Sequence, residues 1–212
     1  MAQKTVKKKK ALFVTVEGLE GSGKSSLIKT LEGLIKSRKL SCKIYREPGT
    51  TRVGEKIRKI LLDKNNSEIS PHTELLLYLA ARTQLIEEKL KKDINIYDVI
   101  ICDRFFDSTL VYQGYALGLG KAAERGVDIF SLGFVPDITF FLDVDPKLGL
   151  SRLKGRDRIE SRPLSFHNRL REGYLQLAKI NSSRIKIINA RASLGEVSTA
   201  ARKLLEGYLE NR

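Results

Sequence analysis

The feature that most constrains the fold of this chain lies near its N-terminus, where a glycine-rich segment directly follows an apolar run. Residues 11–17 read ALFVTVE, residues 18–25 read GLEGSGKS, and an amphipathic stretch occupies 24–38. The eight glycine-rich residues fit the pattern G-x-x-x-x-G-K-[ST], in which glycines let successive backbone N–H groups face an anion. A strand, a phosphate-binding loop and a helix are therefore predicted in that order, and the alternative is a purely structural glycine-rich turn.

Short apolar runs alternate with longer amphipathic stretches along the rest of the chain. Strands are expected at 11–17, 41–46, 98–103, 138–144 and 184–189. Helices are expected at 24–38, 52–63, 71–91, 107–117, 121–133, 146–154, 163–180 and 193–210. This order predicts an α/β fold: a five-stranded parallel sheet flanked by helices, in three layers. Ligands of such sheets bind at the C-terminal ends of the strands.

Length and composition limit the class of protein. The length of 212 residues predicts a single domain, over 11–212. The basic residues that precede the first strand predict a flexible tail over 1–10. No apolar run approaches the ~20 residues that cross a bilayer, and the N-terminus is a poor signal peptide. Cys42 and Cys102 each lie in an apolar run, which indicates reduced packing residues, and the alternative is a disulfide. We therefore expect a cytoplasmic protein with no membrane partner.

The formal net charge of +14 has two interpretations. A strongly basic chain can bind nucleic acid. The run Lys7–Lys10 precedes the first strand and is assigned to the flexible tail. Alternatively, several arginines serve small anionic ligands while the other charges maintain solubility. The chain has no RNA-binding signature, zinc-finger spacing or paired-helix recognition pattern. The small-anion interpretation is therefore favoured, with no nucleic-acid partner.

The phosphate loop (residues 18–25) predicts particular roles for its side chains and for the end of a second strand. Lys24 would reach the β- and γ-phosphates of a nucleoside triphosphate, and the Ser25 hydroxyl would ligate Mg²⁺. Asp103 ends the apolar run VIICD and would be the acidic partner of that Mg²⁺, followed by Arg104. The alternatives are that Asp103 caps a helix and that Arg104 makes a structural salt bridge.

Charged and aromatic residues near other strand ends predict a second anion site. Arg46 and Arg58 follow the second strand, and Tyr78 and Arg82 are four residues apart on one helical face. An aromatic ring and a two-pronged donor of this kind can hold a base, although Tyr78 is also compatible with plain packing. Gln113 can donate to and accept from one edge of a pyrimidine, or be merely solvated.

Residues 151–162, which we name the lid segment, read SRLKGRDRIESR and contain four arginines and one lysine. One interpretation is a solvated charged helix. The other is a mobile lid that brings arginines over transferring phosphates and excludes water.

Together these motifs resemble those of bacterial thymidylate kinases. The resemblance extends from about residue 11 to the C-terminus and rests on EGLEGSGKSS, REPG, EKIRKILLD, TELLLYLAARTQLIEE, CDRFFDSTLVYQG, PDITFFLDVDP and DRIE. It implies transfer of the ATP γ-phosphoryl group to dTMP, giving dTDP and ADP, with Mg²⁺ as the metal. It also implies a P-loop fold of the nucleoside monophosphate kinase type and a homodimer formed through packed helices.

The same resemblance implies roles for individual residues. The residues that would hold ATP are Gly18, Leu19, Glu20, Gly21, Ser22, Gly23, Lys24, Ser25 and Ser26. Those that would bind dTMP are Glu20, Arg46, Arg58, Tyr78, Arg82, Arg104, Thr109, Tyr112 and Gln113. The metal would be held by Ser25 and Asp103. Catalysis would rest on Lys24 and Arg104 and, because the phosphate loop has no arginine, on the lid arginines Arg156 and Arg158.

Two matters remain open from the sequence. Thr50 replaces the glycine of the family's commoner REPGGT turn, so this turn is expected either to avoid positive φ or to be rebuilt. The acceptor could also differ: other nucleoside monophosphate kinases and deoxynucleoside kinases share much of the pattern. A sugar-hydroxyl acceptor would need a general base, for which Glu17 or Glu20 could serve, whereas a phosphate acceptor is already largely ionised at pH 7.

Overall fold

The five expected strands form one sheet, in which every strand pairs in parallel with its neighbours. The computed structural model describes residues 10–210, so residues 1–9 of the expected tail (1–10) and residues 211–212 lie outside it. The sheet order is β2-β3-β1-β4-β5. The strands are β1 (Leu12–Gly18), β2 (Cys42–Arg46), β3 (Val99–Asp103), β4 (Ile138–Asp143) and β5 (Ile185–Asn189). The predicted α/β fold with a five-stranded parallel sheet is confirmed.

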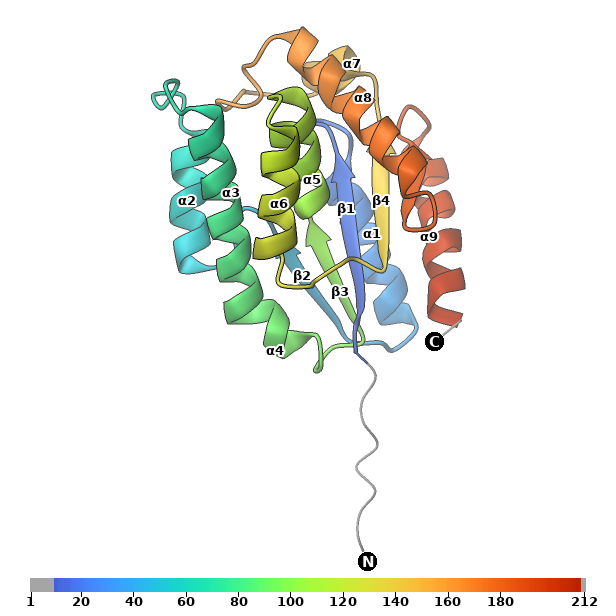
Figure 1. Cartoon of the computed structure of the whole chain (residues 1–212). Helices are drawn as coiled ribbons and strands as arrows, with labels where there is room; N and C mark the ends of the chain where they lie inside the picture. The colour runs from blue at the N-terminus through green and yellow to red at the C-terminus, as the bar shows by residue number, and fades with distance from the viewer. Residues whose placement is uncertain (1–9, 211–212) are drawn as a thin grey trace, which may run out of the picture.

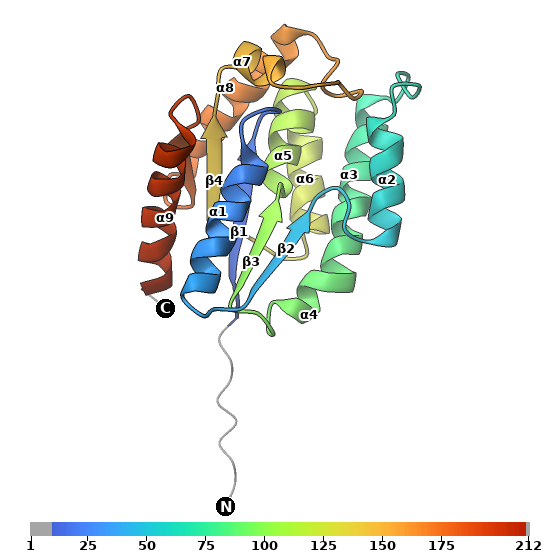
Figure 2. The same cartoon turned by 180° about the vertical axis from the view of Figure 1, so that it is seen from behind.

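Helices cover both faces of this sheet (Figures 1 and 2). One face carries α1 (Lys24–Ser37) and α9 (Leu194–Glu210), which pack against each other. The opposite face carries α5 (Phe106–Thr109), the π-helical segment η2 (Leu110–Ala116) and α8 (Leu164–Ile180). The other helices are α2 (Arg52–Leu62), α3 (Pro71–Leu85), η1 (Ile86–Leu90), α4 (Lys91–Asp93), α6 (Gly120–Phe130) and α7 (Pro146–Ser151).

The near-continuous apolar strands are explained by burial on both faces. Every residue of β1 is buried, and alternate side chains enter different clusters: Val14 belongs to the larger one and Phe13 to a second one around Tyr45 and Phe105. Such two-sided burial holds the strands in register and presents their C-terminal ends at one edge of the sheet. Cys102 is buried in β3 and Cys42 is half-buried in β2, and both are free thiols.

Three expected helices differ in detail from the prediction. Those expected over 71–91 and 107–117 form, but each passes into a π-helical segment, η1 or η2. The helix expected over 146–154 ends at Ser151, and 152–163 forms turns rather than a helix. The solvated-helix interpretation of the lid segment is therefore wrong for most of its length. Gly155 and the flanking charges leave it without an apolar face that could pack as a helix.

The turns after α7 cross above the C-terminal ends of the strands towards α2 and α3 before the chain enters α8 (Figure 1). The lid segment therefore covers the edge of the sheet where ligands of parallel α/β folds bind. Among the helices within residues 10–210, none combines the length and the apolar composition needed to cross a membrane.

Candidate functional site

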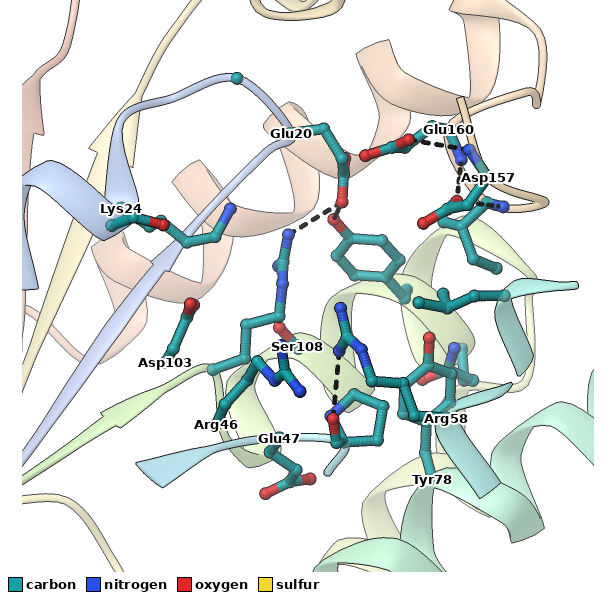
Figure 3. Close-up of a pocket in the computed structure, with 18 residues that line it drawn as sticks. Glu20, Lys24, Arg46, Glu47, Arg58, Tyr78, Asp103, Ser108, Asp157 and Glu160 are labelled. Atoms are coloured by element: carbon teal, nitrogen blue, oxygen red, sulfur yellow. Dashed lines mark hydrogen bonds and ion pairs between the residues drawn. The ribbon is translucent and has the colours of Figure 1, made fainter. Parts of the chain in front are cut away.

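A cavity of about 280 Å³ opens at the C-terminal edge of the sheet, between the phosphate loop, the ends of β2 and β3, α3, η2 and the lid segment. Its volume is near the lower end of the range of roughly 300–1,000 Å³ common for small-molecule sites. Figure 3 shows Lys24 and Asp103 on one side of it and Arg58 and Tyr78 on the other. The predicted site residues that line it are Glu20, Gly21, Lys24, Ser25, Arg46, Arg58, Tyr78, Asp103, Arg104, Tyr112 and Gln113.

The phosphate loop has the backbone geometry that its glycines predict. Gly21 has a φ of +69°, and a Cβ added there would lie 2.0 Å from the carbonyl oxygen of Gly149 in α7, so the two backbones pack directly on each other. The loop ends at Gly23, with a φ of +97°, and no side chain of residues 10–210 caps the first turn of α1. The backbone N–H groups of Ser26 and Leu27 donate to the Gly23 carbonyl, so those that precede them at this helix start are left for an anion, and the helix dipole favours negative charge there.

Lys24 is held by the same loop. Its Nζ donates to the carbonyl oxygens of Gly18 at 3.0 Å and Leu19 at 2.9 Å. Burial, aided by the nearby positive charge of Arg104, lowers the pKa of Lys24 to about 8. The ammonium group therefore remains mostly protonated at pH 7 and is placed to meet a phosphate beside the helix start.

Ser25 and Asp103 both line the cavity and fit the predicted Mg²⁺ site. The Asp103 Oδ1 atom is buried and has no hydrogen-bond partner among residues 10–210, as expected of an oxygen that serves an ion or its waters. Helix α5 begins at Phe106 after Phe105, and no side chain in the described part of the chain caps it, so Asp103 is not the N-cap that the alternative required. Mg²⁺ prefers one or two protein oxygens with water and phosphate oxygens completing the octahedron, and this donor set suits that preference.

Arg104 is both a cavity residue and part of a hydrogen-bonded network. Its φ is +68°, and its backbone N–H donates to the carbonyl oxygen of Val16 in β1 at 3.0 Å. Nη2 donates to Glu20 Oε1 at 2.8 Å, Nη1 donates to Ser108 at 3.2 Å, and the guanidinium lies over the Tyr112 ring at 5.2 Å. The salt-bridge alternative and the functional prediction for Arg104 are thus compatible, since the ion pair aims the guanidinium into the cavity.

Glu20 links the phosphate loop to this network. Burial alone would raise its pKa, but Arg104, Lys24 and the Tyr112 hydroxyl, which donates at 2.8 Å, together hold the pKa of Glu20 below its usual value. Its Oε2 atom is buried 3.9 Å from Nδ1 of His167. An ionised, hydrogen-bonded carboxylate of this kind is a weak base, which argues against Glu20 as the proton acceptor for a sugar hydroxyl.

Glu17 is a site residue whose role sequence reasoning missed. It is fully buried at the end of β1 and accepts from the backbone N–H of Phe105 at 2.8 Å and from the hydroxyls of Ser108 at 2.6 Å and Tyr174 at 2.8 Å. Burial raises the pKa of Glu17 to about 7, although Arg104 opposes the shift. Glu17 does not line the cavity, so it supports the backbone around Arg104 and is not placed to deprotonate a substrate.

The turn after β2 keeps the conformation that a glycine would adopt. Thr50 has a φ of +68°, so the expectation that it would avoid positive φ is wrong. Its Oγ1 accepts from the backbone N–H of Arg46 at 2.9 Å, and its own N–H donates to Glu55 at 2.7 Å. Glu55 also accepts from Arg46 Nη2 at 2.8 Å. These bonds offset the cost of the left-handed backbone and hold Arg46 at the mouth of the cavity.

Arg82 and Thr109 are not cavity-lining residues. Arg82 forms a buried ion pair with Glu47, and its Nη2 donates to Thr109 at 2.8 Å. Its Nε and Nη1 groups are buried without a hydrogen-bond partner among the described residues, so donors remain that an acceptor could satisfy. The predicted contact of Arg82 with a base stays a prediction.

The lid arginines occupy three different environments. Arg158, predicted to be catalytic, is buried away from the cavity lining, where Nη2 donates to Glu74 at 2.7 Å and Nε donates to the carbonyl of Leu61 at 2.7 Å. Arg156, also predicted to be catalytic, is exposed to solvent and outside the cavity lining. Arg152, which was not among the predicted catalytic residues, donates to the carbonyl of Gly21 in the phosphate loop at 3.0 Å. In this conformation Arg158 serves as an anchor because its donors are already engaged.

A second cavity, of about 340 Å³, lies on the other side of the phosphate loop and was not predicted from the sequence. Arg152 and the predicted loop residues Ser22 and Ser26 line it, together with apolar side chains from the segment after β5: Ala190, Ala192, Leu194 and Val197. An apolar slot beside an arginine suits a flat aromatic base. The only available signal was the small-residue segment NARAS after the last strand.

Comparison with known proteins decides the family. The model of the thymidylate kinase family matches residues 16–201, which is most of the chain. The chain belongs to the thymidylate kinase family. The resemblance inferred from the motifs is thereby confirmed.

Individual members of the family support this assignment over nearly the whole length. A thymidylate kinase of Caldanaerobacter subterraneus is 42% identical over 201 residues, which cover 93% of this chain and 96% of that protein. One of Acholeplasma laidlawii is 38% identical, covering 88% of this chain and 94% of that protein. The crystal structure of the thymidylate kinase of Ehrlichia chaffeensis has a TM-score of 0.75 at 30% identity and covers 93% and 99% of the two chains. The predicted nucleoside monophosphate kinase-like fold agrees with this likeness.

Proposed function

We propose that this member of the thymidylate kinase family transfers the γ-phosphoryl group of ATP to dTMP, giving dTDP and ADP, with Mg²⁺ as the metal. The observation that carries the proposal is the pair of cavities on either side of one phosphate loop, which share Gly21 in their linings, with Lys24 and Arg104 lining the first cavity. Two anionic substrates can meet there only if positive groups offset their repulsion, which is the main requirement of phosphoryl transfer.

The donor nucleotide would occupy the second cavity and the phosphate loop. Its base would lie against the apolar side chains beside Arg152. Its phosphates would accept hydrogen bonds from the N–H groups at the start of α1 and from the ammonium of Lys24. Ser25 and Asp103 would hold Mg²⁺ directly or through water, and the ion would supply charge neutralisation between the phosphates. Among the lid arginines, Arg152 and the exposed Arg156 are better placed to follow these phosphates than the buried Arg158.

The acceptor would occupy the first cavity. Its phosphate would lie near Arg46, Arg58 and Arg104, and its base would meet the ring of Tyr78 and the amide of Gln113. Tyr112, which bonds Glu20, would face the sugar, and Arg82 with Thr109 would complete the base site from behind.

A phosphate acceptor needs no strong general base, because its second ionisation is largely complete at pH 7. The two carboxylates considered for a hydroxyl acceptor support this assignment. Glu17 is buried behind the cavity, and Glu20 is held ionised by Arg104 and Lys24. A nucleoside kinase that deprotonates a sugar hydroxyl is therefore disfavoured.

The decisive experiment is a turnover assay with ATP and a panel of acceptors: dTMP, dUMP, UMP and thymidine. We expect dTMP to give the highest kcat/KM and thymidine to give no product. A preference for UMP or thymidine would replace the proposal with another kinase. ATP hydrolysis that responds to DNA but to none of the acceptors would instead identify a nucleic-acid-dependent ATPase.

We also propose that the protein is cytoplasmic, as its composition predicted, and that it forms a homodimer, as the family resemblance implied. In support, Leu76 on α3 and Ile129 on α6 are each 61% exposed, and these two helices pack side by side. A face with such side chains suits a self-complementary helix interface. Analytical ultracentrifugation of the wild type and of Leu76→Glu would test it, because a charge at the interface should shift a dimer towards monomer.

A further inference from the structure

A buried carboxylate at the start of α3, Glu74, joins two parts of the first cavity that are far apart in sequence. Its side chain is 0% exposed. Oε1 accepts from Gln113 Nε2 at 2.9 Å, and Oε2 accepts from Arg158 Nη2 at 2.7 Å and from Arg162 Nη2 at 2.6 Å. A desolvated carboxylate requires partners of this kind, and all three come from η2 and the lid segment.

The bond between Glu74 and Gln113 determines how the Gln113 amide is turned. The Glu74 oxygen accepts from the Gln113 Nε2 atom, so the glutamine directs its NH₂ group towards Glu74. Gln113 lines the cavity whereas Glu74 does not. The carbonyl oxygen of Gln113 is therefore the end of the amide directed away from Glu74 and towards a ligand.

This orientation discriminates between pyrimidines. Thymine carries a proton on N3 and can donate it to the Gln113 oxygen. Cytosine has a bare N3, which accepts, so two lone pairs would face each other. A site that leaves such an atom unpaired rejects the wrong ligand more strongly than one that merely lacks a contact.

On its other oxygen, Glu74 holds the lid segment. Arg158 is further tied to the end of α2 by Nε to Leu61, and the Arg162 guanidinium lies over the Phe166 ring at 4.5 Å. Between these arginines, Ile159 and Glu160 line the cavity. Figure 1 shows the segment reaching from α7 to the adjoining ends of α2 and α3, where Glu74 lies.

We propose that Glu74 is a positioning residue that couples pyrimidine recognition to the lid: one carboxylate turns the Gln113 amide towards an N3–H donor and anchors the lid segment through Arg158 and Arg162. The inference has a discrimination half, which concerns the choice between pyrimidines, and an anchoring half, which concerns the lid segment. The discrimination half rests on the proposed role of Gln113 in binding the base of dTMP. Glu74 itself touches no substrate.

The first test compares wild type, Glu74→Gln and a matched control, Glu87→Gln, with dTMP and dCMP as acceptors. Glu87 is a half-exposed residue of η1 that bonds Lys91 on the surface, so its variant loses the same charge without touching the site. A glutamine at 74 can bond either orientation of the Gln113 amide. We expect the preference for dTMP over dCMP in kcat/KM to fall by about tenfold, mainly through a higher KM for dTMP, and to stay unchanged in Glu87→Gln.

The second test measures amide hydrogen exchange by mass spectrometry and does not depend on turnover. The Arg158 backbone N–H donates to Leu62 at 3.1 Å and should be protected while the lid is anchored. We expect peptides covering 156–162 to exchange at least several-fold faster in Glu74→Gln than in Glu87→Gln, with the sheet unchanged. Unchanged exchange would overturn the anchoring half, and an unchanged dTMP preference would overturn the discrimination half.

Gln113→Leu separates failure of this inference from failure of the proposed function. If the wild type phosphorylates dTMP and Gln113→Leu loses the preference while Glu74→Gln keeps it, the inference alone is wrong. If the wild type phosphorylates none of the pyrimidine monophosphates, the proposed function is wrong, and the exchange measurement still tests the anchor. Should Glu74→Gln not fold, Glu74→Asp replaces it, since the shorter carboxylate cannot reach η2 and the lid segment together. Wild-type behaviour of that variant in both measurements would refute the inference.

Discussion

Replacing Arg104 separates the catalytic role of its guanidinium from the cost of its backbone conformation. Arg104 has a φ of +68°, where a left-handed backbone costs any residue with a Cβ about 1–2 kcal/mol. Arg104→Ala removes the side chain but keeps this cost. Arg104→Gly removes both, although glycine loses about 0.4–1 kcal/mol more conformational entropy on folding. Arg104→Gly should therefore be more stable than Arg104→Ala by roughly 1 kcal/mol, which corresponds to about 2–4 °C in Tm for a chain of this size.

Both variants lose the same functional group. The charge-assisted bond from Nη2 to Glu20 contributes about 1.5–3 kcal/mol to stability, so both should be less stable than the wild type. If Arg104 neutralises the phosphoryl group in transit, kcat should fall by about 10³-fold or more, and equally in the two variants. Turnover of dTMP with ATP and thermal unfolding by circular dichroism provide the two measurements.

Two results would refute this reasoning. Near-wild-type kcat in either variant would mean that the guanidinium serves only the network with Glu20 and Ser108. An Arg104→Ala protein at least as stable as Arg104→Gly would mean that residue 104 does not have a left-handed backbone in solution. Arg104→Lys is a useful control, because it keeps the positive charge and the backbone conformation but loses the planar guanidinium, whose N–H groups can bond two partners at once.

Three further predictions concern the phosphate loop and its support. Lys24→Met should lower kcat by about 100-fold or more with an unchanged circular dichroism spectrum, and normal turnover would exclude Lys24 from phosphate binding. Gly21→Ala should destabilise the protein by about 3 kcal/mol or more, because its Cβ would overlap the Gly149 carbonyl. Gly23→Ala, whose Cβ meets nothing within 4 Å, should lower the stability by only about 1–2 kcal/mol. If denaturant unfolding showed the same loss of stability for Gly21→Ala and Gly23→Ala, the close packing of Gly21 on Gly149 would be contradicted. The Glu17 carboxyl has its pKa raised from 4.5 to about 7, so its protonated form is favoured in the native state. Its contribution is complete below about pH 4.5 and is lost as the pH rises through 7, so Glu17→Gln should gain stability relative to wild type between pH 5 and 8, by up to about 3 kcal/mol. If the difference in the free energy of unfolding between wild type and Glu17→Gln did not change with pH, the raised pKa of Glu17 would be refuted.

The sheet and the phosphate loop could be predicted because their causes are local. An apolar strand buried on both faces is visible in consecutive residues such as those of β1, and the spacing of Gly18, Gly23 and Lys24 is itself the motif. Helix ends were less accurate where the sequence has no cap, and the π-helical segments η1 and η2 have no pattern that distinguishes them from α-helix.

The sequence predicted which residues belong to the candidate site better than it predicted how those residues contact one another. Most predicted residues do line the first cavity, including Arg46, Tyr78 and Gln113, because charged or aromatic residues next to apolar strand and helix patterns are conspicuous. The roles of Glu17 and Glu74 were missed because a carboxylate's function depends on which donors reach it. For Glu74 the donors lie 39 to 88 residues away.

The same reason explains the lid segment. Its composition indicates arginines for phosphates, but composition cannot tell an engaged guanidinium from a free one. Arg158 differs from Arg156 only in that Glu74 and the end of α2 lie within its reach.

The sequence by itself determined the order of strands and helices, the phosphate loop and the family, since each rests on residue types at short spacing. Only the tertiary structure decided which charged groups pair with one another and which remain available to a ligand. Among residues 10–210, it left donors of Arg82 and an oxygen of Asp103 without a hydrogen-bond partner, and it paired Arg158 and Arg162 with Glu74. The physical reason is that burial makes the pairing of a charge decisive, and partners are brought together by the packing of the sheet and helices rather than by their place in the chain.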